Sequence, residues 1–156
     1  MSSATHVTAE LADLFLTVAE KSAFLLGFPV AKEEYRAPGG DWLRAEVRLE
    51  GDLSGRLVLW VPGAAATGMA ADLLGCDPDA LPDPALADDA VGELLNVVAG
   101  QAATAIGGET IAYRVTLPRL ARMAEAAARE ALAADDCLLF EVDEFPFLLQ
   151  VAVAES

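Results

Sequence analysis

Polar side chains recur at helical spacing in one segment of this 156-residue sequence, and together they could position a reacting water molecule. The set ends in a glycine and consists of Asp89, Glu93, Asn96 and Gly100. At about 100° per residue these positions fall within one narrow stripe of a helix. The amide of Asn96 suits a water-positioning role because it offers one acceptor and two donors and carries no charge. Gly100 has no side chain to block the approach of a partner.

The segment that carries this stripe is predicted to be a helix from about Pro84 to Ile106. Asp83 and Pro84 fit an N-cap followed by the first helical residue, and Gly107 and Gly108 end the apolar run. Ala, Val and Leu occupy most of the remaining circumference, so we expect the helix to be buried almost all round. A buried helix that keeps polar groups in line indicates that something docks along the stripe.

The spacing Asp89-x-x-x-Glu93-x-x-Asn96 resembles the phosphatase motif of the CheC/CheX/FliY family, in which an acidic residue or Ser is followed by Glu and then Asn. In size and in its single motif the chain is most similar to CheX-like chemotaxis phosphatase domains. The resemblance covers most of residues 1–156, which we expect to form one domain. It implies an enzyme that accelerates hydrolysis of the aspartyl phosphate of a CheY-like response-regulator receiver domain, in chemotaxis or related two-component signalling.

The same resemblance assigns a role to each residue of the stripe. Glu93 and Asn96 would be catalytic: Asn96 orients the attacking water, and Glu93 pairs with the active-site lysine of the receiver. Asp89 and Gly100 would help to dock the partner. No metal or other cofactor is expected in this chain, and Mg²⁺ is expected in the partner receiver domain. Phosphoryl transfer depends mainly on positioning and electrostatics, so such a helper needs few groups of its own.

Each side chain also has a purely structural interpretation. Asn96 could be a buried amide that bonds a neighbouring loop, Glu93 an ordinary surface carboxylate, and Asp89 a favourable charge early in the helix. Two other functions therefore stay open, a non-catalytic receiver-binding or flagellar interaction module of the same fold and a structural α+β dimer. Exposure of Glu93 and Asn96 on one open face would favour docking, whereas burial with mutual hydrogen bonds would favour packing.

The net charge of −15 argues against binding to nucleic acid or to anionic lipid, both of which call for a basic patch. An acidic receiver would need local complementarity to dock on such a chain. The candidate cations for that contact are Lys21, Arg114, Arg119 and Arg122.

Membrane insertion is not expected. The longest uncharged stretches, 57–71 and 94–108, are shorter than the roughly 18 to 20 residues of a membrane span. The N-terminal segment has no basic region and is interrupted by acidic residues, unlike a signal peptide. We therefore expect a cytoplasmic protein, in which Cys76 and Cys137 are buried, reduced thiols.

The other elements are predicted from hydrophobic period and breaker residues. The clearest strand is 42–50, where charged and apolar residues alternate strictly. Ala-rich composition favours a helix over 119–134. The remaining predicted elements are helices over 9–26 and 64–74, and strands over 30–36, 55–62, 109–117, 137–144 and 147–154.

This order of elements hints at an internal duplication. A shift of 73 positions brings Glu20 onto Glu93, but Ala23 onto Asn96, so only the second half would carry a site. The resemblance implies an α+β, CheC/CheX-like fold. In it, two pseudo-symmetric halves of a helix and three strands form one sheet, with long helices on a face. It also implies a homodimer, which the apolar character of the last two strands fits.

Overall fold

One antiparallel sheet of seven strands organises the computed structural model, which describes the backbone of residues 2–156 and the side chains of residues 9–156. The strand order is β1-β6-β7-β3-β2-β4, and β5 also pairs with β2, beside β4 along the same edge. The strands are β1 (Gly27–Pro29), β2 (Trp42–Gly51), β3 (Leu53–Pro62), β4 (Tyr113–Val115), β5 (Arg119–Met123), β6 (Cys137–Val142) and β7 (Phe145–Glu155). The fold is therefore α+β and matches the predicted class.

Strand pairing follows the same pattern in the two halves of the chain. The hairpins β2–β3 and β6–β7 meet along β3 and β7 at the centre of the sheet. Short β1 from the first half then pairs with β6 of the second, while β4 and β5 of the second half pair with β2 of the first. Two related halves would produce this pattern, and their origin by duplication stays a prediction.

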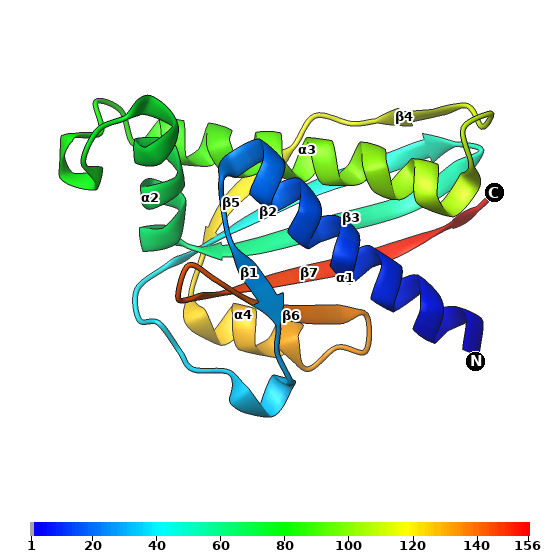
Figure 1. Ribbon diagram of the computed structural model, residues 1–156, viewed down its shortest axis with the longest axis horizontal. Helices are drawn as coiled ribbons and strands as arrows, with labels where there is room; N and C mark the ends of the chain where they lie inside the picture. Colours follow the sequence, from blue (N-terminus) through cyan, green and yellow to red (C-terminus); the bar gives the residue numbers. More distant parts are fainter. Residues whose placement is uncertain (1) are drawn as a thin grey trace.

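Three helices cover one face of the sheet and a short fourth helix covers part of the other (Figure 1). The helices of the first face are α1 (Ser2–Ala23), α2 (Gly63–Leu74) and α3 (Ala85–Gly107). They share the larger hydrophobic core with the sheet. The fourth helix, α4 (Glu125–Leu132), packs over a smaller core that contains Trp42, Trp60 and Leu148. Single 3₁₀ turns occur at Lys32–Glu34 and Pro78–Ala80.

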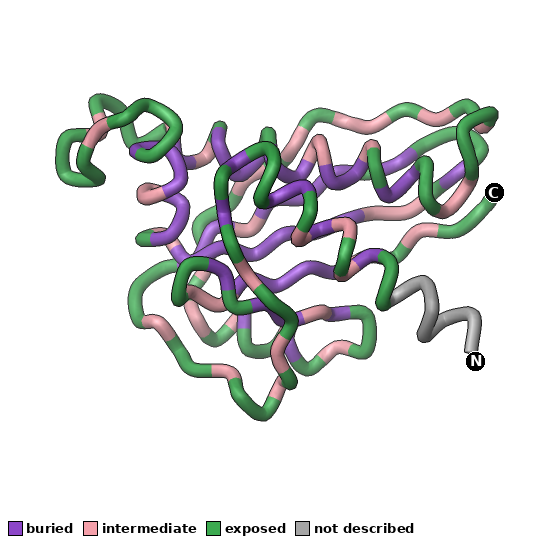
Figure 2. Tube along the Cα trace, viewed as in Figure 1, coloured by how far each residue is buried: buried purple, intermediate pink, exposed green. Residues whose placement is uncertain are grey.

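Alternation along β2 and β3 explains why the two cores lie back to back. Leu43 and Val47 of β2 face the helices, whereas Arg44 and Glu46 lie on the opposite side, as predicted for 42–50. In β3, Leu57 and Leu59 join the larger core and Trp60 joins the smaller one. Interior strands are thus covered on both faces over much of their length, which the burial pattern along the chain displays (Figure 2).

The apolar character of the terminal strands has the same cause. β7 lies between β3 and β6, and it is fully buried from Phe147 to Gln150. Its sequence therefore reflects an interior position in the sheet.

The helix predicted over 119–134 is wrong in its first part. Arg119–Met123 forms β5, which pairs with β2 from Trp42 to Glu46, and only Glu125–Leu132 is helical. Helix propensity is only a weak preference for a helix. The backbone groups on the open edge of β2 need hydrogen-bonding partners, and this pairing makes Arg119–Met123 a strand. Leu120 then packs with the larger core and Met123 with the smaller one.

Three more predicted boundaries are wrong. Residues 30–36 do not form a strand, because β1 (Gly27–Pro29) precedes them and Lys32–Glu34 is a 3₁₀ turn. The strand predicted over 109–117 is limited to β4, Tyr113–Val115. The first helix ends at Ala23, because Phe24 adopts a left-handed conformation with φ of 58°. The amide of Leu25 then donates to the carbonyl of Ala19 at 3.1 Å, which closes the helix.

Candidate functional site

Helix α3 carries the polar stripe and lies over β2 and β3, beside α1 and α2 (Figure 1). Its sheet-facing side is packed with residues such as Val91, Leu95 and Ala99, each with 0 % exposure. On the other side Asp89 and Glu93 are exposed, and Asn96 and Gly100 are half-buried. The expectation of burial almost all round is therefore wrong, because no described residue covers Asp89 or Glu93. The four residues nevertheless share one accessible stripe, as predicted.

Glu93 and Asn96 have no internal partner within the described part of the chain, since neither side chain has a hydrogen bond or an ion pair there. Polar groups that serve packing are normally bonded to a neighbour. Glu93 thus meets the exposure expected for docking, whereas Asn96 is half-buried and meets only the expectation of no mutual hydrogen bond.

Gly92 and Gly100 each lie one turn from Asn96 on α3, and their surroundings differ. A Cβ on Gly92 would lie 3.4 Å from the ring carbons Cβ and Cγ of Pro118, so Gly92 allows α3 to approach the β4–β5 connection. A Cβ on Gly100 would meet only the hydroxyl oxygen of Tyr113, at 4.0 Å. Among the described residues, packing therefore requires a glycine at 92 but not at 100, and this leaves room for a partner beside Gly100.

A groove between α1 and α3 adjoins the stripe, with a volume of about 420 Å³. Leu14, Val18 and Lys21 of α1 line it, together with Val97 and Gln101 of α3. Sequence reasoning did not single out the last two. The sequence signal that could have identified Val97 and Gln101 is their spacing from Asn96. They lie one and five positions further on, along the neighbouring side of the same helix.

Leu117 is a second feature that the sequence did not reveal. It is 85 % exposed in the connection between β4 and β5, and it directly precedes the Pro118 that packs against Gly92. An exposed leucine next to an accessible polar stripe supplies an apolar contact for whatever docks there.

The first turn of α3 is held by acidic residues. The carboxylate of Asp83 accepts a hydrogen bond from the amide of Ala85 at 2.9 Å, as expected of a helix start. Asp88 forms an ion pair with Arg122 of β5 at 3.4 Å. Asp89 itself has no ion pair with a described residue and stays exposed at the edge of the stripe.

The four cations predicted to assist docking are not on one surface. Lys21 lines the groove beside α3, and Arg122 lies at the start of α3. Arg114 and Arg119 face away from the helices, since they lie opposite Glu50 and Glu46 of β2 in the strand pairing. For these two the prediction is wrong, because the sequence alone did not reveal the strand pairing that assigns them to a face.

Both cysteines are free thiols in the described part of the chain. Cys137 is buried, and this burial raises the pKa of its thiol to about 11. Cys76 is only half-buried, so the prediction of burial is correct for one of the two. Within residues 9–156 no three His, Cys, Asp or Glu side chains are grouped as a metal site would require. No helix in the described residues is both long and apolar enough to cross a bilayer.

Comparison with known proteins gives one family. The family model described as Chemotaxis phosphatase CheX matches residues 44–140, more than half of the chain. No curated protein matches the sequence.

Solved structures similar to this chain have low sequence identity and so speak to the fold alone. CheX from Desulfovibrio desulfuricans has a TM-score of 0.66 at 16 % identity, over 97 % of this chain and 99 % of that one. A CheX–CheY–BeF₃–Mg²⁺ complex from Borrelia burgdorferi has a TM-score of 0.59 at 16 % identity, over 93 % of this chain and 96 % of that one. FliY from Thermotoga maritima has a TM-score of 0.59 at 14 % identity, over 97 % of this chain and 90 % of that one.

Proposed function

Because the chain belongs to the chemotaxis phosphatase CheX family, we propose that it accelerates hydrolysis of the aspartyl phosphate on a CheY-like receiver domain. One observation carries the proposal to this chain: Glu93 and Asn96 share an accessible stripe of α3 and have no hydrogen-bonding partner among the described residues. A similar CheX structure was solved with CheY bound, which supports a receiver as the partner class. Chemotaxis or a related two-component pathway is the setting that we propose.

In this proposal Asn96 enters the receiver site and its amide holds a water in line with the phosphorus. A neutral group with both donor and acceptor atoms can fix the orientation of that water without repelling it or the phosphate. Glu93 forms an ion pair with the lysine of the receiver, which fixes the depth of insertion. The Mg²⁺ belongs to the receiver, and this chain supplies no cofactor.

Docking would use the surfaces on either side of the stripe. Asp89 extends the polar contact toward the start of α3, and Gly100 lets the partner backbone approach closely. Leu117 would add an apolar contact, and Lys21 a positive charge at the groove. These contacts lie on the helical side of the sheet, which is the side we assign to the receiver.

The proposal also covers assembly and location. Phe24, Leu26 and Phe28, at 75, 66 and 53 % exposure, form an apolar edge around β1, and we assign a homodimer contact to it. A monomeric mass by light scattering, unchanged by Leu26→Ser, would remove that assignment. Residues 1–156 are proposed to form a single domain, because every strand belongs to one sheet. A cytoplasmic location is also proposed, since a receiver domain is the expected partner.

The test measures decay of phosphorylated receiver domains from the same cell, with and without this protein. Parent protein should shorten the lifetime of the phosphate on at least one receiver. Asn96→Asp keeps the size of the side chain but replaces the neutral amide with a carboxylate, so it should abolish the acceleration. Thr104→Ala, an exposed change two turns further along α3, is the matched control and should be as active as the parent.

An alternative function is a non-catalytic module that binds a receiver or a flagellar protein. The structural similarity to FliY supports this alternative function. It predicts receiver binding with an unchanged phosphate lifetime, and binding that survives Asn96→Asp. Unchanged decay of every receiver, with folded parent protein, would favour this module over the phosphatase.

A further inference from the structure

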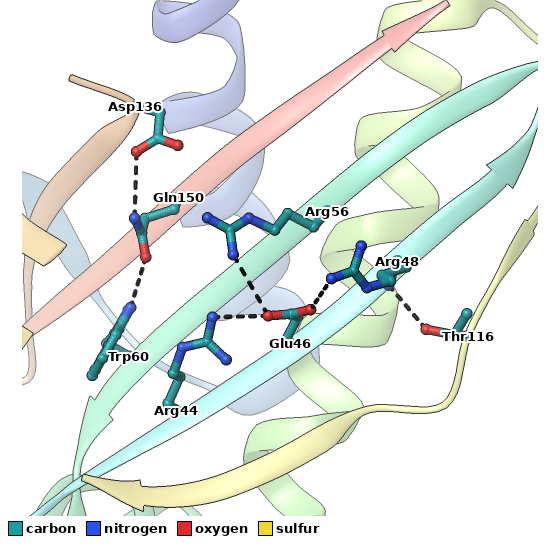
Figure 3. A network of polar contacts seen from close by, with 8 residues as sticks. All are labelled: Arg44, Glu46, Arg48, Arg56, Trp60, Thr116, Asp136 and Gln150. Atoms are coloured by element: carbon teal, nitrogen blue, oxygen red, sulfur yellow. Dashed lines mark hydrogen bonds and ion pairs between the residues drawn. The ribbon is translucent and has the colours of Figure 1, made fainter. Parts of the chain in front are cut away.

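The face of the sheet that points away from α1, α2 and α3 carries a cluster of arginines around one carboxylate (Figure 3). Glu46, only 8 % exposed, lies within 2.8 Å of Arg44, 3.3 Å of Arg48 and 3.8 Å of Arg56. Burial alone would raise the pKa of Glu46, but the hydrogen bond from Arg44 and the three positive charges outweigh it and lower that pKa. Glu46 is thus an anion that holds the guanidinium groups in place.

The cluster has more positive charge than Glu46 can balance. Arg119 of β5 lies opposite Glu46 in the strand pairing, so its side chain points to the same face. One carboxylate then faces four guanidinium groups, which leaves a local net charge of about +3 on a chain whose total is −15. Of two other acids, Glu50 is balanced by its ion pair with Arg114, whereas Asp136 accepts a hydrogen bond from the neutral amide of Gln150 and keeps its negative charge.

The floor of this face is small and open next to the arginines. Ala121, Ala152 and Ala154 are exposed, and they lie opposite Arg44, Arg56 and Ser54 in the strand pairing. On the other half of the same face, α4 already packs against the sheet, where larger side chains such as Trp60 and Leu148 form the floor. Next to the part that α4 covers, the sheet therefore leaves a strip of small side chains that no described element covers.

We propose that this arginine face binds the acidic side of an α-helix from a partner protein. Residues two apart on a strand are about 6.8 Å apart and neighbouring strands about 4.8 Å, which is close to the 5 to 6 Å between the Cβ atoms of residues at i and i+4 of a helix. Guanidinium groups bind carboxylates in a planar, two-pronged geometry. Arg44 is further held over the ring of Trp60 at 5.7 Å, so part of the surface is preorganised.

Charge distribution favours this occupant over two others. A long polyanion such as nucleic acid would meet the field of a −15 protein beyond the patch, since charges interact over about 8 to 10 Å at physiological salt. A second copy docked symmetrically would bring the same positive patch against itself. The surface also lies on the opposite side of the sheet from Glu93 and Asn96, so a helix could bind here while a receiver is docked.

Fluorescence anisotropy of a labelled helical peptide of Ala and Glu, with Glu at i and i+4, tests the proposal on the full chain. Binding is expected at low salt and should weaken as salt is raised. Arg48→Gln and Arg56→Gln should each weaken it roughly 3- to 5-fold, the effect of losing one partly exposed ion pair. Arg36→Gln removes the same charge from an exposed arginine elsewhere and should leave binding unchanged.

Three results would overturn the proposal. The first is no binding of the Ala/Glu peptide by a parent protein that is folded by circular dichroism. The second is equal weakening by Arg36→Gln, which would mean non-specific attraction. The third is equal or tighter binding of unstructured poly-glutamate or of single-stranded DNA, which would remove the helix as the preferred ligand. Asn96→Asp should not alter peptide binding, so failure here and failure of the phosphatase assignment are distinguishable.

Discussion

Polar residues on the two sides of the sheet differ in exposure and in bonding. On the helical face, Glu93 and Asn96 are accessible and have no internal partner within the described residues. On the other face, Glu46 is almost fully buried and shared by three arginines. Charged residues that bond one another stabilise the fold, whereas accessible groups without partners contribute little to it. Changes at Glu93 should therefore affect activity and spare stability, and changes at Glu46 should do the reverse.

The largest expected effect is at Glu93. Glu93→Lys would place a positive charge where the proposed partner presents its lysine, so receiver insertion should be repelled. We expect the acceleration of phosphate decay to fall about 100-fold, the scale of losing a positioned catalytic contact. Glu109→Lys makes the same charge change at an exposed residue beyond the end of α3 and serves as the control. A Glu93→Lys protein as active as this control would contradict the role of Glu93.

The reverse effect is predicted at Glu46. Glu46→Ala leaves Arg44, Arg48 and Arg56 facing one another without a carboxylate between them. We expect it to lower the free energy of unfolding by about 2 kcal/mol. This is less than for a fully buried ion pair, because the arginines remain partly exposed. Urea unfolding measures it. Glu50→Ala, at an exposed ion pair, should change stability by less than about 1 kcal/mol. Phosphatase activity should be unchanged in both.

The pH dependence of that stability has a definite sign. Because folding lowers the pKa of Glu46 below its usual 4.5, its stabilising effect is complete above that value and is lost as the pH falls through the lower, folded-state pKa. Parent and Glu46→Ala should therefore differ most near neutral pH and converge in acid. A difference in unfolding midpoint that stays constant from neutral to acidic pH would contradict the charge-based explanation.

Smaller effects distinguish the two glycines of α3. Gly92→Val would push against Pro118 and should destabilise the fold by about 1 to 2 kcal/mol. Gly100→Val meets open space beside Tyr113, so stability should hold while receiver binding weakens. Thermal unfolding and receiver titration measure the two outcomes. Equal destabilisation by both changes would mean that Gly100 also serves packing.

Local patterns in the sequence predicted the parts of the molecule that depend on one element at a time. Strict alternation identified the strand at 42–50, and helical spacing identified the stripe on α3. Long-range pairing decided the rest. Arg119–Met123 became a strand because β2 had an open edge, and this pairing moved Arg119 to the face opposite the stripe. The open side of α3 likewise depends on where α1 lies, which no property of the α3 sequence specifies.

The most direct test of the phosphatase assignment is the lifetime of a phosphorylated receiver at saturating concentrations of parent protein and of Asn96→Ala. Binding of each protein to the receiver is measured alongside. We expect Asn96→Ala to bind the receiver but to leave its phosphate lifetime as long as in the absence of protein, while the parent shortens it. Equal shortening by both proteins would contradict the proposed role of Asn96, because the amide on α3 would then have no part in the hydrolysis.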